Sequence, residues 1–398
     1  MFKKLITLAI FLTTGMATFA QQALWGGQNI VSPEIKENNT VTFRLNAPQA
    51  LKVELAGDFI PTKKMETPMG VMDMPGSVEL TKNDKGVWEY TTPEPLSPEL
   101  YSYTFTVDGA KVTDPGNVYM IRDVASVTSI FIIGGGHADL YKVNNVPHGT
   151  VARRWYESPG LKLTRRITIY TPPGYETGKE NYPVLYLLHG AGGDEEAWIA
   201  LGRTSQILDN LIAQGKAKPM IVVMTNGNAG QEAAPGEASE GFIRPSFMGA
   251  TRMDGDFEVS FTDVTNFVES NYRTIKQKSG RAICGLSMGG FHSLHISKQY
   301  PDMFDYVGLF SAAIIPNENA KSSVYEDLEG KLKVQFDKKP KLYWIAIGKT
   351  DFLYKANQDF IKLLDEKGHK YLYYETDGGH IWRNWRIYLS EFAPMLFK

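Results

Sequence analysis

The sequence predicts two structural units, an all-β sandwich followed by a doubly wound α/β sheet. Three observations support this prediction. Short alternating strands separated by turn residues occupy the chain from about residue 25 to residue 133, and strands alternate with helical patterns after about residue 141. One junction between a strand and a helix carries a G-x-S-x-G pentapeptide. The length of 398 residues is enough for one large domain and one smaller domain.

The first unit, residues 24–134, alternates apolar and polar side chains with the two-residue period of half-buried strands. Turn residues such as Asp108 and Gly109 separate the strands, which is typical of a β-sandwich of roughly 110 residues. The expected strands include Val41–Leu45, Leu51–Leu55, Tyr101–Val107 and a last strand at Val127–Ile133. Three glycines, Gly134–Gly136, then begin a predicted linker over residues 135–150.

In the second unit, residues 151–398, apolar runs of strand length alternate with amphipathic helical patterns. Ligands of such sheets bind beyond the carboxyl ends of the strands, so residues that directly follow a strand are the candidates for chemistry. The expected buried parallel strands are Val184–Leu188, Ile221–Thr225, Ala282–Gly285, Val307–Ser311, Leu342–Gly348 and Tyr371–Glu375. The expected helices are Arg203–Gln214, Phe261–Asn271, Met288–Gln299, Ala356–Lys367 and Trp385–Leu396.

The first residues indicate export. Lys3 and Lys4 precede the apolar stretch Leu5–Leu12, and Thr18–Ala20 supplies small residues for cleavage, so residues 1–20 are predicted to be a signal peptide. The apolar stretch is shorter than the ~20 residues of a membrane-spanning helix. We therefore expect a secreted protein, periplasmic or extracellular, with no membrane association after cleavage.

The composition excludes several classes of function. With 42 basic and 44 acidic residues, nothing indicates binding to nucleic acid or to an anionic membrane surface. Cys284 is the only cysteine, which excludes an intrachain disulfide. The sequence contains no H-E-x-x-H motif and no other metal-ligand spacing, so neither a metal nor another cofactor is expected. No feature of the sequence fixes the oligomeric state.

The pentapeptide identifies a candidate nucleophile. Ser287 lies between Gly285 and Gly289, after an apolar strand and before a helical pattern, as in a nucleophile elbow. Such a turn strains the serine backbone and exposes its hydroxyl above the edge of the sheet. Cys284, in the preceding strand, is expected to be a small buried hydrophobic residue.

A serine nucleophile needs a base, and the base needs an orienting acid. Of the seven histidines, His380 is favoured because it follows the final strand at the carboxyl edge. Asp351 follows strand Leu342–Gly348 at the same edge, although it is also a candidate helix N-cap, and Asp377 is the alternative acid. The order Ser287, Asp351, His380 is the chain order of α/β-hydrolases.

An ester hydrolase also needs two donors for the oxyanion. One candidate is the backbone N–H of Met288, directly after the serine. The other is in the glycine-rich loop His189–Gly193, where Ala191 is the expected donor and His189 is expected to brace the loop.

Several separated motifs over about residues 145–398 resemble carbohydrate esterase family 1, which contains feruloyl and acetyl xylan esterases. The resemblance implies an α/β-hydrolase fold, places the family triad on Ser287, Asp351 and His380, and places the oxyanion donors on Ala191 and Met288. The motifs are Val146–Val151, Tyr170–Tyr175, His189-Gly190 with Gly192-Gly193, Gly285–Gly290 and Gly379–Arg386.

The sandwich resembles a carbohydrate-binding module of family 48, an early-set, immunoglobulin-like domain. The segments Val41–Pro48, Gly86–Glu89, Val107–Gly109 and Asp114-Pro115 support the resemblance. Trp88 is either a platform for a sugar ring or a core residue. The domain as a whole either binds polysaccharide or shapes the cleft of the esterase.

Together the two resemblances imply a secreted serine esterase that releases ferulic acid from feruloylated arabinoxylan or xylo-oligosaccharides, or alternatively an acetyl xylan esterase. Plant cell-wall polysaccharide is the implied partner. The residues 226–261 are expected to form substrate walls, and Trp198 and Trp382 either pack against an aryl group or anchor loops. Two rivals are a siderophore esterase that cleaves a catecholate trilactone and a non-catalytic polysaccharide-binding protein. The complete set of triad residues argues against the second.

Overall fold

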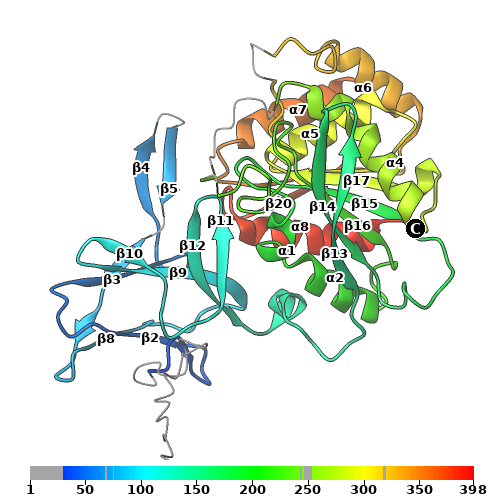
Figure 1. The fold of residues 1–398 in the computed structure, drawn as a ribbon. Helices are drawn as coiled ribbons and strands as arrows, with labels where there is room; N and C mark the ends of the chain where they lie inside the picture. The colour runs from blue at the N-terminus through cyan, green and yellow to red at the C-terminus, as the bar shows by residue number, and fades with distance from the viewer. Residues whose placement is uncertain (1–29, 68–69, 75, 243, 246–252, 317–319) are drawn as a thin grey trace, which may run out of the picture.

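The computed structural model describes residues 30–67, 70–74, 76–242, 244–245, 253–316 and 320–398. The predicted signal peptide lies outside the described residues. Within those ranges, no helix combines the length and the apolar character that crossing a membrane requires. Figure 1 shows two lobes side by side, a smaller β-lobe and a larger lobe in which helices flank a sheet.

The smaller lobe is the predicted all-β sandwich. One sheet has the order β1 (Glu34–Ile35), β2 (Val41–Asn46), β8 (Val87–Thr91) and β7 (Thr81–Lys82). The other has the order β11 (Met120–Asp123), β12 (Ser126–Ile133), β9 (Glu99–Val107), β3 (Val53–Gly57) and β6 (Ser77–Glu79), with β10 (Ala110–Val112) beside β9. A separate hairpin, β4 (Lys63–Thr67) and β5 (Gly70–Met74), extends from this lobe and was not predicted.

Trp88 belongs to the core of the sandwich. It is only 5% exposed, packs with residues such as Phe43 and Phe105, and donates a hydrogen bond from Nε1 to the carbonyl of Ala47 at 2.9 Å. Of the two interpretations of Trp88, the structure therefore supports a packing role.

The larger lobe contains an eight-stranded sheet in which the six predicted strands are parallel, as expected. Its order is β13 (Thr150–Ser158), β14 (Leu163–Thr171), β16 (Ile221–Thr225), β15 (Val184–Leu188), β17 (Arg281–Leu286), β18 (Tyr306–Phe310), β19 (Leu342–Gly348) and β20 (Leu372–Thr376).

Two expectations about this sheet need correction. The strands β13 and β14 were missed, and because they pair antiparallel the sheet is mixed. Each carries two adjacent arginines that interrupt the apolar pattern, and two of these, Arg165 and Arg166, are buried because they have partners. The final strand was expected to be buried, but β20 is an edge strand and its side chains are mostly exposed or half-buried.

Helices cover both faces of the sheet, as a doubly wound fold requires. α1, α2 and α8 pack on one face, while α3 to α7 pack on the other. Alternate residues of each strand serve the two cores: Leu185 and Leu187 face the first group, and Tyr186 faces the second. The helices are α1 (Ala197–Ala200), α2 (Thr204–Ala213), α3 (Asp256–Val259), α4 (Phe261–Asn271), α5 (Met288–Gln299), α6 (Leu328–Asp337), α7 (Tyr354–Glu366) and α8 (Trp382–Phe392), with 3-10 turns η2 (Gly136–Tyr141), η3 (Lys278–Gly280) and η4 (Ala393–Met395).

A buried ion pair joins the two lobes. Arg386 of α8 donates to Glu99 of β9 at 2.9 Å and to the carbonyl of Leu100 at 3.0 Å, and both charged side chains are at most 3% exposed. His137 of η2 also contacts Glu99, at 3.0 Å. Burial disfavours the Glu99 carboxylate, but the bond to His137 and the charge of Arg386 hold its pKa below the ordinary value. The lobes therefore share an interface that contains a paired buried charge, in which Nε of Arg386 has no hydrogen-bond partner among the described residues.

Candidate active site

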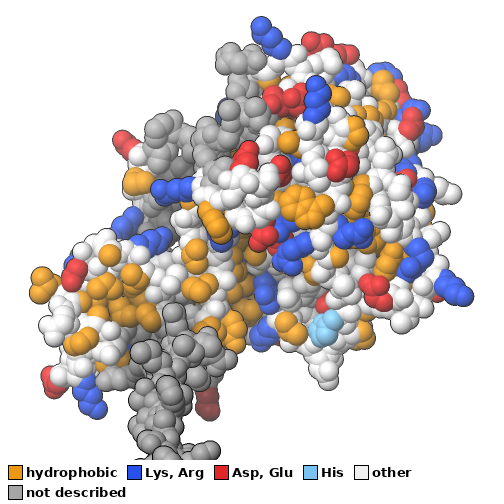
Figure 2. Space-filling view, in the orientation of Figure 1, with side chains coloured by type: hydrophobic (Ala, Val, Ile, Leu, Met, Phe, Trp, Pro, Cys, Tyr) orange, Lys and Arg blue, Asp and Glu red, His pale blue; other side chains and the backbone are white. Residues whose placement is uncertain are grey.

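A cavity of about 820 Å³ lies where the sandwich meets the carboxyl edge of the large sheet. Figure 2 shows hydrophobic and basic side chains gathered where the smaller lobe meets the larger one. The predicted site residues Ser287, His380, Ala191 and Trp382 all line this cavity. The sandwich contributes its own wall, made by Asp58, Glu99 to Ser102, Ile121 to Val124, Thr128 and Ile130.

Ser287 occupies a strained turn between β17 and α5. Its φ of 54° and ψ of −114° fall in a region that residues other than glycine rarely adopt, at a cost of about 1–3 kcal/mol. The backbone around β18 holds the turn: Ser287 N donates to the carbonyl of Phe310 at 2.9 Å, and Ala313 N donates to the carbonyl of Ser287 at 3.0 Å. The geometry is that of a nucleophile elbow.

Glycines allow this turn because neighbouring backbone leaves no space for a side chain. A Cβ at Gly289 would lie 2.3 Å from the carbonyl oxygen of Leu188, and one at Gly285 would lie 2.5 Å from the carbonyl carbon of Gly289. A Cβ at Gly190 would lie 3.3 Å from the Cβ of Ser287. The glycine-rich loop after β15 is therefore packed directly against the serine.

The structure brings Asp351 and His380 together. Nδ1 of His380 is 3.0 Å and 2.9 Å from the two carboxylate oxygens of Asp351, whose side chain is fully buried. One of these oxygens also accepts from the backbone N–H of Leu353 at 2.9 Å, so Asp351 additionally bonds the start of the next helix. The alternative acid, Asp377, is 94% exposed and bonds Lys349 instead.

Aromatic rings hold the imidazole of His380 in place. The ring of Phe352 lies 4.5 Å from it, and Trp385 meets it edge-on at 4.9 Å. Because Nδ1 is bonded to Asp351, Nε2 is the nitrogen left for another partner. Among the described residues, the hydroxyl of Ser287 makes no hydrogen bond to His380, although both line the cavity. Such bonds are often long before a substrate is bound.

The two expected oxyanion donors flank the serine. Met288 is the first residue of α5, a helix of 12 residues, so its N–H has no partner within the helix and lies at the positive end of the helix dipole. Ala191 lines the cavity from the glycine-rich loop. His189 braces that loop: Nδ1 donates to the carbonyl of Gly190, and Nε2 accepts from Gly227 N, each at 2.7 Å. Burial lowers the pKa of His189 to about 4, so the ring is neutral.

Sequence reasoning missed a buried ion pair next to this loop. Glu195, fully buried, accepts from Nε of Arg166 at 2.7 Å and from the backbone N–H of Ala234 at 2.8 Å. Burial and the neighbouring Asp194 raise the pKa of Glu195, and Arg166 opposes them. The pair connects the glycine-rich loop to the predicted substrate wall, where Ala234 lines the cavity. Arginines inside an otherwise apolar strand were the signal that could have revealed it.

Comparison with known proteins identifies the family. Residues 158–396 match the family model described as a putative esterase, and residues 30–123 match the model of carbohydrate-binding module 48, the isoamylase N-terminal domain. The chain belongs to the putative esterase family. Both matches confirm the two family resemblances stated from the sequence.

Two curated relatives of this esterase have names that describe an activity. The endo-1,4-beta-xylanase/feruloyl esterase of Xylanibacter ruminicola is 29% identical over 374 residues, which are 92% of this chain and 46% of the relative. The acetyl esterase of Caldicellulosiruptor saccharolyticus is 26% identical over 251 residues, which are 56% of this chain and 86% of that protein. The chain spans less than half the length of the first relative.

Solved structures share the fold of the esterase. The CE1 ferulic acid esterase of Anaeromyces mucronatus has a TM-score of 0.53 at 26% identity, covering 64% of this chain and 93% of that one. The enterobactin esterase of Shigella flexneri has a TM-score of 0.64 at 17% identity, covering 96% of this chain and 99% of that one. The second comparison shows that the fold is shared over both lobes.

The two predicted aromatic residues have different positions in the esterase. Trp382 lines the cavity at the start of α8. Trp198 does not line it: the residue is 1% exposed, donates from Nε1 to the carbonyl of Leu188 at 2.9 Å, and packs edge-on against Trp382 at 5.3 Å. Of its two predicted roles, we therefore assign to Trp198 that of a loop anchor, which supports Trp382. Phe352 and Tyr101, which also line the cavity, were not singled out in the sequence.

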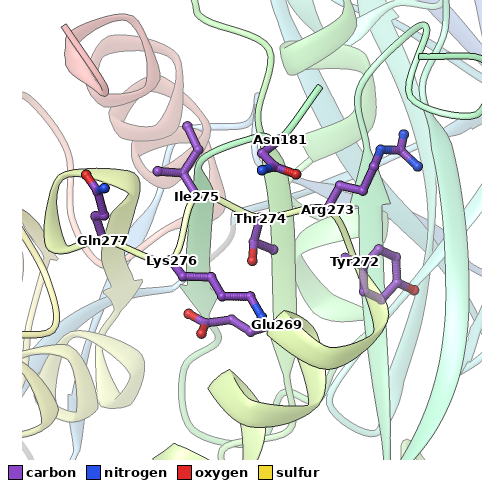
Figure 3. Close-up of a pocket in the computed structure, with 8 residues that line it drawn as sticks. All are labelled: Asn181, Glu269, Tyr272, Arg273, Thr274, Ile275, Lys276 and Gln277. Atoms are coloured by element: carbon purple, nitrogen blue, oxygen red, sulfur yellow. The ribbon is translucent and has the colours of Figure 1, made fainter. Parts of the chain in front are cut away.

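A second hollow of about 500 Å³ lies at the opposite edge of the sheet. Figure 3 shows its lining side chains around the segment between α4 and β17, with Glu269, Arg273 and Lys276 among them. This segment leads into the amino end of β17, whereas Ser287 follows the carboxyl end. The second hollow is therefore separate from the chemistry of the esterase, and within the described residues no group of three potential metal ligands adjoins either cavity.

Proposed function

We propose that this esterase is an exported serine hydrolase that releases ferulic acid from feruloylated arabinoxylan or xylo-oligosaccharides. The observation that carries the mechanism is the buried Asp351 bonded to His380, beside a cavity that also contains the strained Ser287. We also propose the division into a signal peptide at 1–20, a sandwich at 24–134, a linker at 135–150 and the esterase domain at 151–398, in which the linker packs through buried Ala138 and Tyr141.

In this mechanism the hydroxyl of Ser287 attacks the ester carbonyl while Nε2 of His380 accepts its proton. The carboxylate of Asp351 holds the proton of the imidazole on Nδ1 and stabilises the imidazolium that forms. The backbone N–H groups of Ala191 and Met288 donate to the oxyanion of the tetrahedral intermediate. His380 then protonates the sugar oxygen as its bond to the acyl carbon breaks, so the sugar leaves as an alcohol and an acyl-enzyme ester on Ser287 remains. Water, deprotonated by His380, attacks that ester and releases the acid.

The composition of the cavity supports a substrate with an aromatic acid and a polar alcohol. Phe352, Trp382 and Trp385 give the part near His380 an aromatic lining that suits a hydroxycinnamoyl ring. The sandwich wall adds charged and hydroxyl-bearing residues, including Asp123 and Arg122, which suit sugar hydroxyls. The names of the xylanase/feruloyl esterase relative and of the ferulic acid esterase structure support the same substrate class.

Replacement of Ser287 by alanine tests the mechanism. We expect kcat for methyl ferulate to fall by at least about a thousandfold, because the acyl-enzyme can no longer form. Ser297→Ala is a matched control: it lies on the same helix, is buried, and bonds only the carbonyl of Leu294 at 3.2 Å. Hydrolysis by the Ser287 variant near the wild-type rate would contradict the assignment.

An acetyl esterase is the second candidate, because a relative carries that name. Destarched bran and acetylated xylan, incubated separately with the enzyme, distinguish the two: ferulic acid released in excess over acetic acid supports the first proposal. A catecholate trilactone serves as the third substrate and tests the siderophore alternative. Release of neither acid, together with binding of xylan in calorimetry, would favour the non-catalytic alternative.

A further inference from the structure

Arg122 of the sandwich reaches across the boundary between the lobes. Its Nη2 donates to a carboxylate oxygen of Asp194 at 2.5 Å, and its Nη1 donates to the carbonyl of Val124 at 3.0 Å. The Asp194 side chain is 2% exposed and that of Arg122 is 33% exposed. The sandwich thus supplies the positive partner of a carboxylate that the esterase domain buries.

Asp194 closes the glycine-rich loop that carries Ala191. Within the loop, Gly193 N donates to the carbonyl of Gly190 at 3.0 Å, which forms a tight turn around Ala191. The other carboxylate oxygen of Asp194 accepts from the backbone N–H of Glu196 at 3.0 Å. The carboxylate therefore has one oxygen bonded to its own segment and the other bonded to the sandwich.

The next two residues show a different arrangement. Glu195 accepts a hydrogen bond from Arg166 of β14. Glu196 accepts from Nε and Nη2 of Arg153 of β13, at 2.8 and 2.7 Å. Both arginines belong to the esterase domain itself. Of these three consecutive carboxylates, only Asp194 takes its arginine from the sandwich.

A buried carboxylate without its cation is costly, so the segment would rearrange to expose Asp194 if Arg122 were absent. Such a shift would move Ala191, three residues earlier, relative to Ser287. We propose that Arg122 is a positioning residue for the oxyanion loop, and that docking of the sandwich is needed to place this loop for catalysis. The inference rests on the proposed function, because it assumes that Ala191 donates to the oxyanion.

The proposal differs from a role of the sandwich in holding polysaccharide, because it requires an effect on the smallest esters. With p-nitrophenyl acetate, we expect Arg122→Met to lower kcat about 10- to 100-fold while KM changes less than about twofold, as for a misplaced oxyanion donor. Arg122→Lys, which keeps a positive charge, should recover part of kcat. Arg44→Met is the matched control, because Arg44 pairs with Glu34 and Glu89 within the sandwich and does not line the cavity.

A double-mutant comparison of kcat tests most directly whether Arg122 and Asp194 act through the same bond. Asp194→Asn should also lower kcat, and the double variant with Arg122→Met should be no slower than the slower single variant, because both changes break the same bond. Melting curves show whether each variant is folded; if Arg122→Met does not fold, Arg122→Lys and Asp194→Asn carry the same comparison.

An unchanged kcat for p-nitrophenyl acetate in the folded variants would overturn the proposal, as would kcat losses that multiply in the double variant. Both results leave the proposed function intact. A wild-type enzyme without Ser287-dependent hydrolysis would instead overturn the proposed function, and the two failures are therefore distinguishable.

Discussion

Replacing Asp351 by asparagine tests the acid of the proposed triad, and the structure indicates how the amide would be oriented. One carboxylate oxygen of Asp351 accepts from Leu353 N at 2.9 Å as well as from Nδ1 of His380 at 3.0 Å, and the second oxygen is 2.9 Å from the same Nδ1. The amide oxygen of asparagine would remain on Leu353, because that backbone donor needs an acceptor. The amide NH₂ would then face Nδ1.

An NH₂ group donates, so it stabilises the tautomer of His380 in which Nδ1 accepts and Nε2 carries the proton. In that tautomer Nε2 cannot accept the proton of Ser287. Loss of the correct tautomer costs about 10⁴-fold in kcat in the serine protease case, which corresponds to about 5.4 kcal/mol of transition-state stabilisation. Because the Asp351 side chain is fully buried, water cannot replace the second carboxylate oxygen as an acceptor for Nδ1.

The assay is kcat for methyl ferulate, with the melting temperature as a check on folding. Asp377→Asn is the matched control: its side chain is 94% exposed, pairs with Lys349, and should leave kcat within about twofold. If Asp351→Asn kept more than a tenth of the wild-type kcat, the role assigned to Asp351 would be refuted. A large loss in the Asp377 variant would move the assignment to that residue.

Two further predictions concern the aromatic wall and the lobe interface. Trp382→Ala should raise KM for methyl ferulate about 2- to 10-fold, because an aromatic contact contributes about 0.5–1.5 kcal/mol, and should change KM for p-nitrophenyl acetate less. The control is Trp155→Ala, which replaces a tryptophan that is 47% exposed on an edge strand and should change neither KM. Glu99→Gln should destabilise the protein at pH 7, since His137 and Arg386 outweigh burial and hold the pKa of Glu99 below its ordinary value in the folded state. That contribution is present above the unfolded-state pKa and is lost as the pH falls through the folded-state pKa, so the difference in unfolding free energy between wild type and variant should be smaller at acidic pH, below the ordinary pKa of a glutamate, than at pH 7. Denaturant titrations at both pH values measure it, and a constant difference would contradict the linkage.

Much of the fold could be predicted because its signals are local. Alternation in Val41–Leu45 and the apolar run Leu342–Gly348 each specify a strand within a few residues. The rule that ligands bind at the carboxyl ends of parallel strands then selected His380 from seven histidines. The structure adds what the rule does not contain, the bond from His380 to Asp351.

The sequence alone could not reveal features that depend on contacts between residues far apart in the chain. Arg165 and Arg166 make β14 look polar, and they are buried because acceptors from other segments, such as Glu195 and the carbonyl of Asn226, satisfy them. A pattern of hydrophobicity cannot show whether a charged side chain has such a partner.

The boundary between the lobes is the clearest case of this limit. Arg122 and Asp194 are 72 residues apart, and neither stands out within its own segment. Arg122 lies on a strand of the sandwich, whose family resemblance suggests a separate binding module. Asp194 follows the glycine-rich loop, which the sequence motifs already assign to the oxyanion donor. Their contact, like that of Arg386 with Glu99, shows that one lobe completes the charge balance of the other. In this esterase, the sandwich therefore has two surfaces with different roles. One is available to bind a polysaccharide, and the other faces the glycine-rich loop that carries Ala191. The proposed role of Arg122 in positioning that loop would make the sandwich part of the catalytic unit, whatever the first surface binds, and small-ester kinetics of Arg122 variants separate the two roles.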